Sequence, residues 1–390
     1  MIDYEKYFNT TINSLSGSVM LELQKEAEKY PDCITLGIGE PDFKTPYRIR
    51  EAGIQSLERG RTWYTPGDGI MPLKKAIVAY QKRRFKLDYT TDEVMVTVGG
   101  SEGIDMFFRT MLNPGDEVIL PTPCYVSYDP IAKMCGATVV PIALKQENDF
   151  KITKEQLRRA ISPKSKILVL PYPGNPTGAI LEEEDLLDIA EVIRDTDIFV
   201  MTDEIYAELT YGEYRHVSFA SIPGMKERTV VINGFSKPYA MTGWRLGYAM
   251  GPKPIIDRMN ALHGVAVICA PTTSQYAAVV AMNECDDEID KMRYQYNMRR
   301  KFIINELNSI GLHCYNAQGA FYVFADIRST GLSSEEFALQ LLRDQHLVVI
   351  PGVAFGRAGE GFIRISYSYS LDHLMEGTRR ISEFLKTIKK

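Results

Sequence analysis

The sequence lacks closely spaced cysteines, an excess of positive charge and any long hydrophobic run. Its six cysteines form no Cys-x-x-Cys pair, which argues against a structural zinc site and indicates reduced thiols in a reducing compartment. Fifty acidic residues outnumber 45 basic ones, whereas nucleic-acid binding normally requires a basic surface. No apolar run approaches membrane-spanning length, and residues 1–10 lack the apolar core of a signal peptide. We therefore expect a globular, cytoplasmic protein with no metal and no nucleic-acid or membrane partner.

The length of 390 residues exceeds that of a usual single core, so a large and a smaller unit are expected. Between about residues 70 and 250, short apolar β-branched runs alternate with helical patterns, as in a parallel sheet covered by helices. Strands are expected at 94–98, 117–120, 138–142, 166–170, 198–202, 229–233, 246–250, 319–326, 348–351 and 361–366. Helices are expected at 71–85, 101–112, 182–194, 286–307, 333–344 and 371–386. We predict an α/β fold with a large domain (46–285), a small α+β domain (286–390) and an N-terminal segment (1–45) that packs with the small domain.

A glycine-rich segment follows the first expected strand of the large domain. It contains Gly100 and Ser101 and leads directly into an apolar helix. Glycines let backbone N–H groups approach an anion, and a helix N-terminus favours negative charge. A tight turn is the simpler interpretation of this segment alone, and phosphate binding by Gly100 and Ser101 is the functional one.

Polar residues also follow two later strands, at the edge where open parallel sheets bind their ligands. The loop 171–178 is dense in proline and glycine and contains Asn175, which taken singly is explained by turn chemistry. Asp203 directly follows the strand 198–202. It could cap the next helix beside a solvated Glu204, or it could hold a cationic group such as a protonated pyridine nitrogen.

The most informative segment follows the strand 229–233 and contains Ser236, Lys237 and Arg245. A lysine among small and apolar residues is unusual, because burial of an ammonium group is costly. Desolvation lowers the pKa of such a lysine and favours Schiff-base chemistry. Arg245 offers a planar group that can bind phosphate with two hydrogen bonds. Alternatively, Lys237 is an ordinary loop lysine and Arg245 a structural arginine. The complementary groups at the other strand ends favour the functional interpretation over this one.

These residues together resemble a known family. The run Gly234-Phe235-Ser236-Lys237 with Gly243-Trp244-Arg245-Leu246-Gly247 resembles the Schiff-base lysine signature of class I aminotransferases of fold type I. The segments 36–43, 64–67, 175–178, 203–206 and 362–366 resemble other landmarks of the family, in the expected order from about residue 34 to 374. Within the family, the chain is similar to prokaryotic aspartate and aromatic aminotransferases. The resemblance implies a large domain with a mostly parallel seven-stranded sheet.

The resemblance also implies a pyridoxal 5′-phosphate cofactor and a role for each site residue. Lys237 would carry the cofactor and transfer the proton, and Asp203 would pair with the pyridine nitrogen. The other cofactor contacts would be Asn175 and Tyr206 at the ring oxygen, Tyr125 stacked on the ring, Gly100, Ser101, Ser236 and Arg245 at the phosphate, and Tyr64 at the phosphate of the neighbouring subunit.

For the substrates, the resemblance implies amino acids and 2-oxo acids that react in turn at one site. Arg364, with Asn175 and the backbone of Gly39, would bind the α-carboxylate. The contribution of Tyr64 to the neighbouring site would make a homodimer obligatory. Taken singly, Tyr64 and Tyr125 would be packing residues, Arg364 a strand arginine facing solvent and Gly39 a turn glycine.

The substrate side chain is the part that the sequence defines least. Ser101 stands where some aspartate-preferring relatives carry a lysine, and Gly234 stands where some members carry a hydroxyl group. We expect an aromatic or broad amino donor and 2-oxoglutarate as acceptor, with residues 16–18 forming part of the pocket. Aspartate transamination and C–S β-lyase activity on the same fold are the alternatives. A regulatory cofactor-binding domain would need a DNA-binding helix-turn-helix, for which we expect no room before Ser14 or after Lys386.

Overall fold

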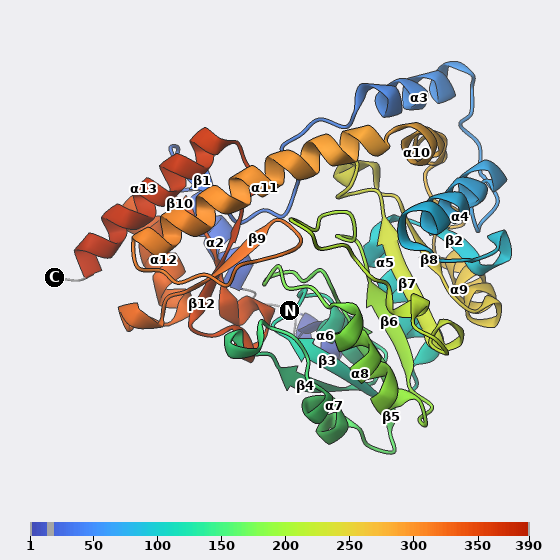
Figure 1. Ribbon diagram of the computed structural model, residues 1–390, viewed down its shortest axis with the longest axis horizontal. Helices are drawn as coiled ribbons and strands as arrows, with labels where there is room; N and C mark the ends of the chain where they lie inside the picture. The colour runs from blue at the N-terminus through green and yellow to red at the C-terminus, as the bar shows by residue number, and fades with distance from the viewer. Residues whose placement is uncertain (1, 14–18, 389–390) are drawn as a thin grey trace.

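The computed structural model describes residues 2–13 and 19–388 and has a seven-stranded sheet at its centre (Figure 1). Strand β8 is antiparallel to both of its neighbours, and the other pairs are parallel, so the predicted mostly parallel sheet is confirmed. In spatial order the strands are β2 (Val94–Thr97), β8 (Gly247–Met250), β7 (Thr229–Gly234), β6 (Phe199–Asp203), β5 (Ser165–Leu170), β3 (Glu117–Thr122) and β4 (Thr138–Ala143).

Alternate residues of the central strands pack against helices on opposite faces of the sheet. In β5, Ile167 and Val169 belong to an apolar cluster with α5 (Gly99–Met111), whereas Leu168 and Leu170 belong to a cluster with α8 (Glu183–Ile193). This two-residue period makes the central strands apolar on both faces, which is why they were recognisable as continuous apolar runs.

Six helices occur where the sequence predicts them, within two residues at each end. These are α4 (Met71–Phe85), α5, α8, α11 (Asp286–Ser309), α12 (Ser334–Gln345) and α13 (Leu371–Ile388). The capping box formed by Ser333 and Glu336 explains the start of α12. Further helices of the described residues are α1 (Thr10–Asn13), α2 (Val19–Ala27), α3 (Tyr47–Glu58), α6 (Tyr128–Met134), α7 (Lys154–Ala160), α9 (Lys253–Ala266) and α10 (Thr272–Glu284).

The C-terminal part forms a smaller layer beside the large sheet. Its antiparallel sheet has the order β11 (Ile350–Pro351), β12 (Phe362–Ser366) and β9 (Tyr322–Asp326). The long helix α11 runs from the large sheet to this layer (Figure 1). Strand β1 (Ile34–Thr35) pairs with β10 (Leu347–Val348), so the N-terminal segment contacts the C-terminal part. The domain limits at residues 45 and 285 stay a prediction.

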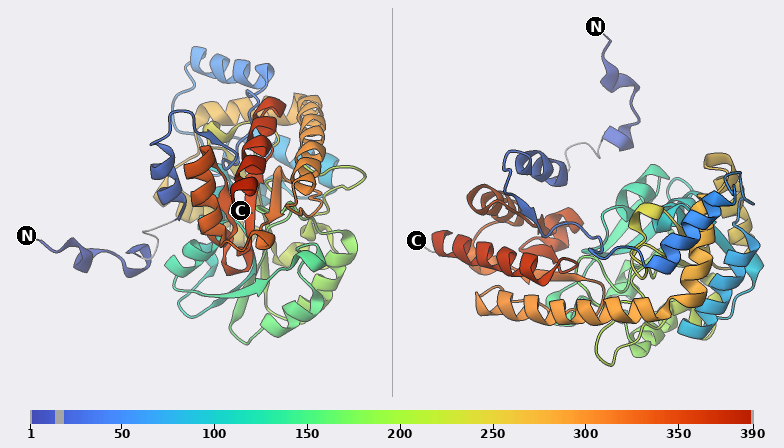
Figure 2. Two further views of the ribbon diagram at one scale, coloured as in Figure 1. Left: turned by 90° about the vertical axis from the view of Figure 1, so that its left-hand side faces the viewer. Right: turned by 90° about the horizontal axis from the view of Figure 1, so that it is seen from above.

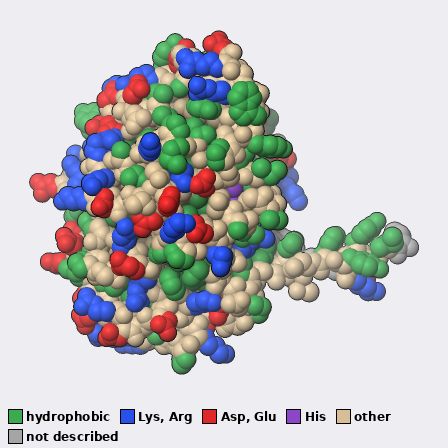
Figure 3. Space-filling model, turned by 90° about the vertical axis from the view of Figure 1, so that its right-hand side faces the viewer, with side chains coloured by type: hydrophobic (Ala, Val, Ile, Leu, Met, Phe, Trp, Pro, Cys, Tyr) green, Lys and Arg blue, Asp and Glu red, His purple; other side chains and the backbone are tan. Residues whose placement is uncertain are grey.

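The surface carries no single-signed patch on the face seen in Figure 3, where acidic and basic side chains are interspersed. The N-terminal residues project from the body as an arm (Figure 2) and expose apolar side chains such as Tyr4 and Tyr7. None of the helices in residues 2–13 and 19–388 combines the length and the apolar character that a membrane span requires. The predicted contribution of residues 16–18 to the substrate pocket falls outside the described residues.

Candidate active site

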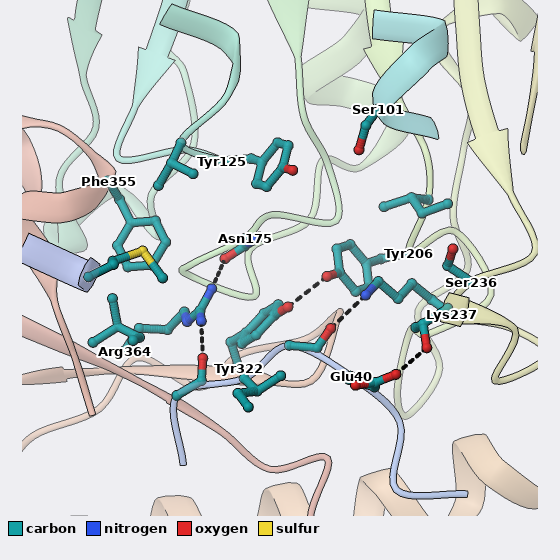
Figure 4. A pocket seen from close by; sticks show the side chains of 18 of the residues that line it. Glu40, Ser101, Tyr125, Asn175, Tyr206, Ser236, Lys237, Tyr322, Phe355 and Arg364 are labelled. Carbon is teal, nitrogen blue, oxygen red and sulfur yellow. Dashed lines mark hydrogen bonds between the residues drawn. The ribbon is translucent and has the colours of Figure 1, made fainter. Parts of the chain in front are cut away.

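A cavity of about 870 Å³ lies at the carboxyl ends of the central strands, between the large sheet and the C-terminal layer. Every site residue predicted from the sequence lines it except Tyr64, which is 74% exposed and lies outside. The predicted residues that meet there are Gly39, Gly100, Ser101, Tyr125, Asn175, Asp203, Tyr206, Ser236, Lys237, Arg245 and Arg364. Figure 4 shows Ser236 and Lys237 towards one end of the cavity, Arg364 and Phe355 towards the other, and Asn175 between them.

Lys237 lies in the turn after β7, and its side chain points into the cavity (Figure 4). Its Nζ donates a hydrogen bond of 2.6 Å to the carbonyl oxygen of Gly39. Burial lowers the pKa of Lys237 to about 8; Arg364 and Arg245 add to this effect, and Glu40 opposes it. A substantial fraction of the amine is therefore neutral near pH 8, and a neutral amine is the nucleophilic form.

Asp203 is the last residue of β6 and is buried. Its Oδ1 accepts a hydrogen bond of 3.1 Å from the Ile205 N–H, and its Oδ2 accepts one of 2.6 Å from the Tyr128 hydroxyl. Burial raises the pKa of Asp203, and the hydrogen bond from Tyr128 lowers it. Because a turn follows β6 instead of a helix, the helix-capping interpretation is wrong. Asp203 thus presents a buried carboxylate to the cavity.

Glu204 contradicts the expectation of a solvated neighbour. Its side chain is fully buried and accepts hydrogen bonds from Thr202 (3.1 Å) and Ser218 (2.6 Å), and it faces His216 at 3.0 Å. It is not among the residues that line the cavity. The adjacent acids Asp203 and Glu204 therefore have different surroundings, and only the first faces the cavity.

Arg364 lies on β12 and is 5% exposed, so the interpretation as a strand arginine facing solvent is wrong. Its Nη1 donates to Asn175 Oδ1 at 2.9 Å, and its Nη2 donates to the carbonyl oxygen of Gly37. Its Nε is buried without a partner, and no acidic side chain among the described residues forms an ion pair with it. A buried cation that contacts only neutral groups is costly unless an anion joins it.

Tyr322, which no sequence motif marks as a site residue, connects two of the predicted residues. Its hydroxyl is 2.7 Å from the hydroxyl of Tyr206, and its ring lies 4.5 Å from the guanidinium carbon of Arg364. A Cβ atom added to Gly39 would lie 2.0 Å from the Tyr322 hydroxyl. Gly39 is therefore required for close approach of its backbone to the site, beyond any role in a turn.

The other end of the cavity has the features of an anion site. Gly100 and Ser101 lie in the first turn of α5, where backbone N–H groups have no partner within the helix. Gly99 has a left-handed φ of 75°, and a Cβ atom there would lie 2.7 Å from Arg245 Nη2, so the guanidinium packs against the start of α5. Ser236 is buried nearby and lines the same cavity.

Apolar side chains surround Arg364 at its end of the cavity. Phe355 lies 4.8 Å from the guanidinium carbon, measured to the ring centroid. Lysine and arginine side chains among the described lining residues are limited to Lys237, Arg245 and Arg364. The other apolar residues lining the cavity include Met20 and Leu23 of α2, Ile38, Val348 and Ile350. This wall could not be predicted from the sequence, since its members come from segments far apart in the chain.

Comparison with known proteins gives consistent matches over nearly the whole chain. The family model described as aminotransferase class I and II matches residues 31–381. The aspartate aminotransferase of Pyrococcus horikoshii is 40% identical over 390 residues, which cover 99% of each chain. The aromatic-amino-acid aminotransferase 2 of Thermococcus litoralis is 38% identical over 366 residues, covering 93% of this chain and 94% of the relative. The crystal structure of an aromatic aminotransferase from Pyrococcus horikoshii OT3 has a TM-score of 0.90 at 39% identity, covering 94% of this chain and 99% of that one.

Proposed function

This chain belongs to the class I and II aminotransferase family, and on that premise we propose that it transfers the amino group of an aromatic or other apolar L-amino acid to a 2-oxo acid. Its fold is that of the fold type I enzymes of this family. One observation carries the assignment of the site: Lys237, Asp203 and the anion site at the start of α5 line a single cavity. The proposed cofactor is pyridoxal 5′-phosphate.

The residues present fit this cofactor by their chemistry. The N–H groups at the start of α5, with Arg245 and Ser236, would hold a phosphate group. The buried carboxylate of Asp203 would hold a proton on the pyridine nitrogen, because a nearby opposite charge favours the charged form. Tyr125 would stack on the ring, and Asn175 and Tyr206 would hydrogen-bond the ring oxygen. The amine of Lys237, with its pKa lowered to about 8, would bind the aldehyde carbon.

The bound cofactor would supply an electron sink for the negative charge that remains when the substrate α-proton leaves. Lys237, released when the substrate amino group takes its place, would remove that proton and return it one carbon away. An amine with a pKa of about 8 can both accept and donate a proton near neutral pH. Arg364, with Asn175 and the Gly39 backbone, would hold the α-carboxylate and so orient the Cα–H bond. The partnerless Nε of Arg364 is the donor that such a carboxylate would satisfy.

The apolar wall supports an aromatic or aliphatic amino donor. A distal carboxylate placed against Met20, Leu23 and Phe355 would meet no cation of the described residues beyond the three already assigned. An unpaired buried charge is costly, so aspartate and glutamate are expected to be poorer donors. The acceptor 2-oxoglutarate is proposed on the resemblance to the family alone. Its second carboxylate would meet the same cost at the wall, so we expect an apolar 2-oxo acid to be accepted as well.

A homodimer is proposed because exposed apolar residues gather around Tyr64. Trp63 is 67% exposed, Val265 87% and Ile268 48%. The backbone of Ile268 lies beside Gly67, and the carbonyl oxygen of Trp63 accepts a hydrogen bond from Thr272, so these segments adjoin. Exposed apolar clusters of this kind mark protein–protein contacts. A second copy would cover the cluster and receive Tyr64 at its phosphate site.

A cytoplasmic location, supported by six free thiols, is also part of the proposal.

A panel of amino donors tests the proposed substrate class. With 2-oxoglutarate and separately with 2-oxobutanoate as acceptor, kcat/KM for phenylalanine, tyrosine or leucine should exceed that for aspartate by about tenfold or more. Phe355→Ala should lower the ratio of kcat/KM for phenylalanine to that for alanine, because alanine does not reach the wall. Aspartate as the best donor with both acceptors would contradict the donor proposal, and pyruvate release from cystathionine faster than any transamination would favour the β-lyase alternative.

A further inference from the structure

Tyr128, at the start of α6, has no assigned role but contacts two residues of the proposed cofactor site. Its side chain is 2% exposed. Its hydroxyl lies 2.6 Å from Asp203 Oδ2, and its ring meets the ring of Tyr125 edge to face, with centroids 5.5 Å apart. One buried phenol therefore joins the carboxylate proposed for the ring nitrogen to the aromatic ring proposed to stack on the cofactor.

The direction of this hydrogen bond follows from the chemistry of its partners. An ionised carboxylate only accepts, so the Tyr128 hydroxyl must donate. Burial, and then the negative charge of Asp203, raise the pKa of Tyr128 well above its usual value, so the phenol stays protonated and remains a donor. The other carboxylate oxygen accepts the Ile205 N–H. With one donor on each oxygen, the plane of the carboxylate is fixed with respect to the cavity.

The contact also acts on the charge of Asp203. Asp203 is buried beside Glu204, and both burial and that neighbour favour its neutral form, whereas the hydrogen bond from Tyr128 favours the anion. A charge-assisted hydrogen bond to a buried carboxylate is among the stronger polar contacts in proteins. The side chain of Lys237 is the cation that acts on Asp203 in the same direction.

We propose that Tyr128 is a positioning residue for amino transfer: its hydroxyl keeps Asp203 oriented for the ring nitrogen of the bound cofactor. This inference rests on the proposed function, because it requires pyridoxal phosphate in this cavity. Tyr128 itself would touch neither the substrate nor the reacting atoms and would act only through Asp203.

The direct test replaces Tyr128 with phenylalanine, which removes the hydroxyl and retains the ring against Tyr125. In the holoenzyme, kcat should fall about ten- to a hundredfold, while KM for the amino donor changes less than about twofold, because Asp203 does not contact the substrate. With 15N-labelled pyridoxal phosphate, the ring-nitrogen resonance should move towards that of a neutral pyridine. Tyr248→Phe is the matched control: this fully buried hydroxyl accepts a hydrogen bond of 2.7 Å from Gln81 away from the cavity, and kcat should be retained.

A cofactor analogue separates positioning from general loss of packing. When the ring nitrogen is replaced by carbon, Asp203 has no partner on the ring. The Tyr128→Phe protein and the wild type should then turn over at equal, low rates with this analogue. If the role of Tyr128 were purely structural, the ratio of the Tyr128→Phe rate to the wild-type rate would be the same with the analogue as with pyridoxal phosphate.

The outcomes distinguish this inference from the function on which it rests. Wild-type kcat in Tyr128→Phe, an unmoved nitrogen resonance, or an equal loss with both cofactors would overturn the role of Tyr128 while leaving amino transfer intact. A wild type that transfers no amino group would overturn both. An Asp203→Asn variant with unchanged kcat would overturn the role of Asp203, and with it that of Tyr128, while leaving amino transfer intact.

Discussion

Replacing Lys237 with alanine is expected to lower transamination by about 10²- to 10⁴-fold or more, because the change removes both the covalent attachment point and the general base. No other lysine among the described residues lines the cavity, so none can take its place. The variant should still bind pyridoxal phosphate through the groups at the start of α5 and Arg245, but without the visible absorption band of the lysine-bound cofactor.

The control for this change is Lys166→Ala, which removes a lysine paired with Asp116 at 2.7 Å outside the cavity. That variant should keep both the absorption band and the wild-type rate. Steady-state rates and absorption spectra of the three proteins at saturating cofactor provide the measurement. Full activity in Lys237→Ala would end the proposal.

Asp203→Asn is expected to lower kcat by about 10²- to 10³-fold, since loss of one partner of a buried charge pair costs about 3–5 kcal/mol. The amide retains the shape of the side chain and an oxygen that can accept from Tyr128, so cofactor binding should be partly preserved. The loss should therefore lie in kcat more than in the dissociation constant of pyridoxal phosphate.

The neighbouring acid supplies the comparison. Glu204→Gln alters a side chain that contacts Thr202, Ser218 and His216 and does not line the cavity. It should lower the stability of the protein and leave kcat within about threefold of the wild type. Equal rates in Asp203→Asn and the wild type would exclude the pairing of Asp203 with the ring nitrogen.

The central sheet, and the functional side chains at the carboxyl ends of its strands, could be predicted from the sequence. Central strands such as β5 and β7 are apolar on both faces, so they stand out as continuous runs. Since ligands of such sheets lie beyond the carboxyl ends of the strands, Asp203 and Lys237 could be placed together before the structure was known. Their roles in catalysis remain proposals that the two substitutions above test.

Contacts between distant segments could not be predicted in the same way. Tyr128 and Asp203 are separated by 75 positions, and their hydrogen bond depends on the side-by-side order of β3, β5 and β6. Tyr322 approaches Gly39 only after the C-terminal layer has packed against the N-terminal segment. The burial of Glu204 was likewise unpredictable, because its partners Ser218 and His216 follow more than ten residues later.

Helices with small or polar buried residues were also missed. The residues that α10 buries include Ser274, Gln275 and Ala277, which give no apolar stripe of helical period. Helix α2 carries Met20 and Leu23 into the cavity, and its apolar face became interpretable only once the C-terminal layer was seen beside it. Side-chain specificity depends on this wall, which explains why the sequence left the donor open.

All of these proposals require that the Lys237 amine hold pyridoxal phosphate covalently in the cavity that contains Asp203. Reduction of the cofactor-loaded protein with borohydride, followed by proteolysis and mass spectrometry, would locate that bond. A phosphopyridoxyl group is expected on the peptide that contains Lys237, at about one equivalent per chain. Labelling at another lysine in place of Lys237, or no stable label at all, would contradict it.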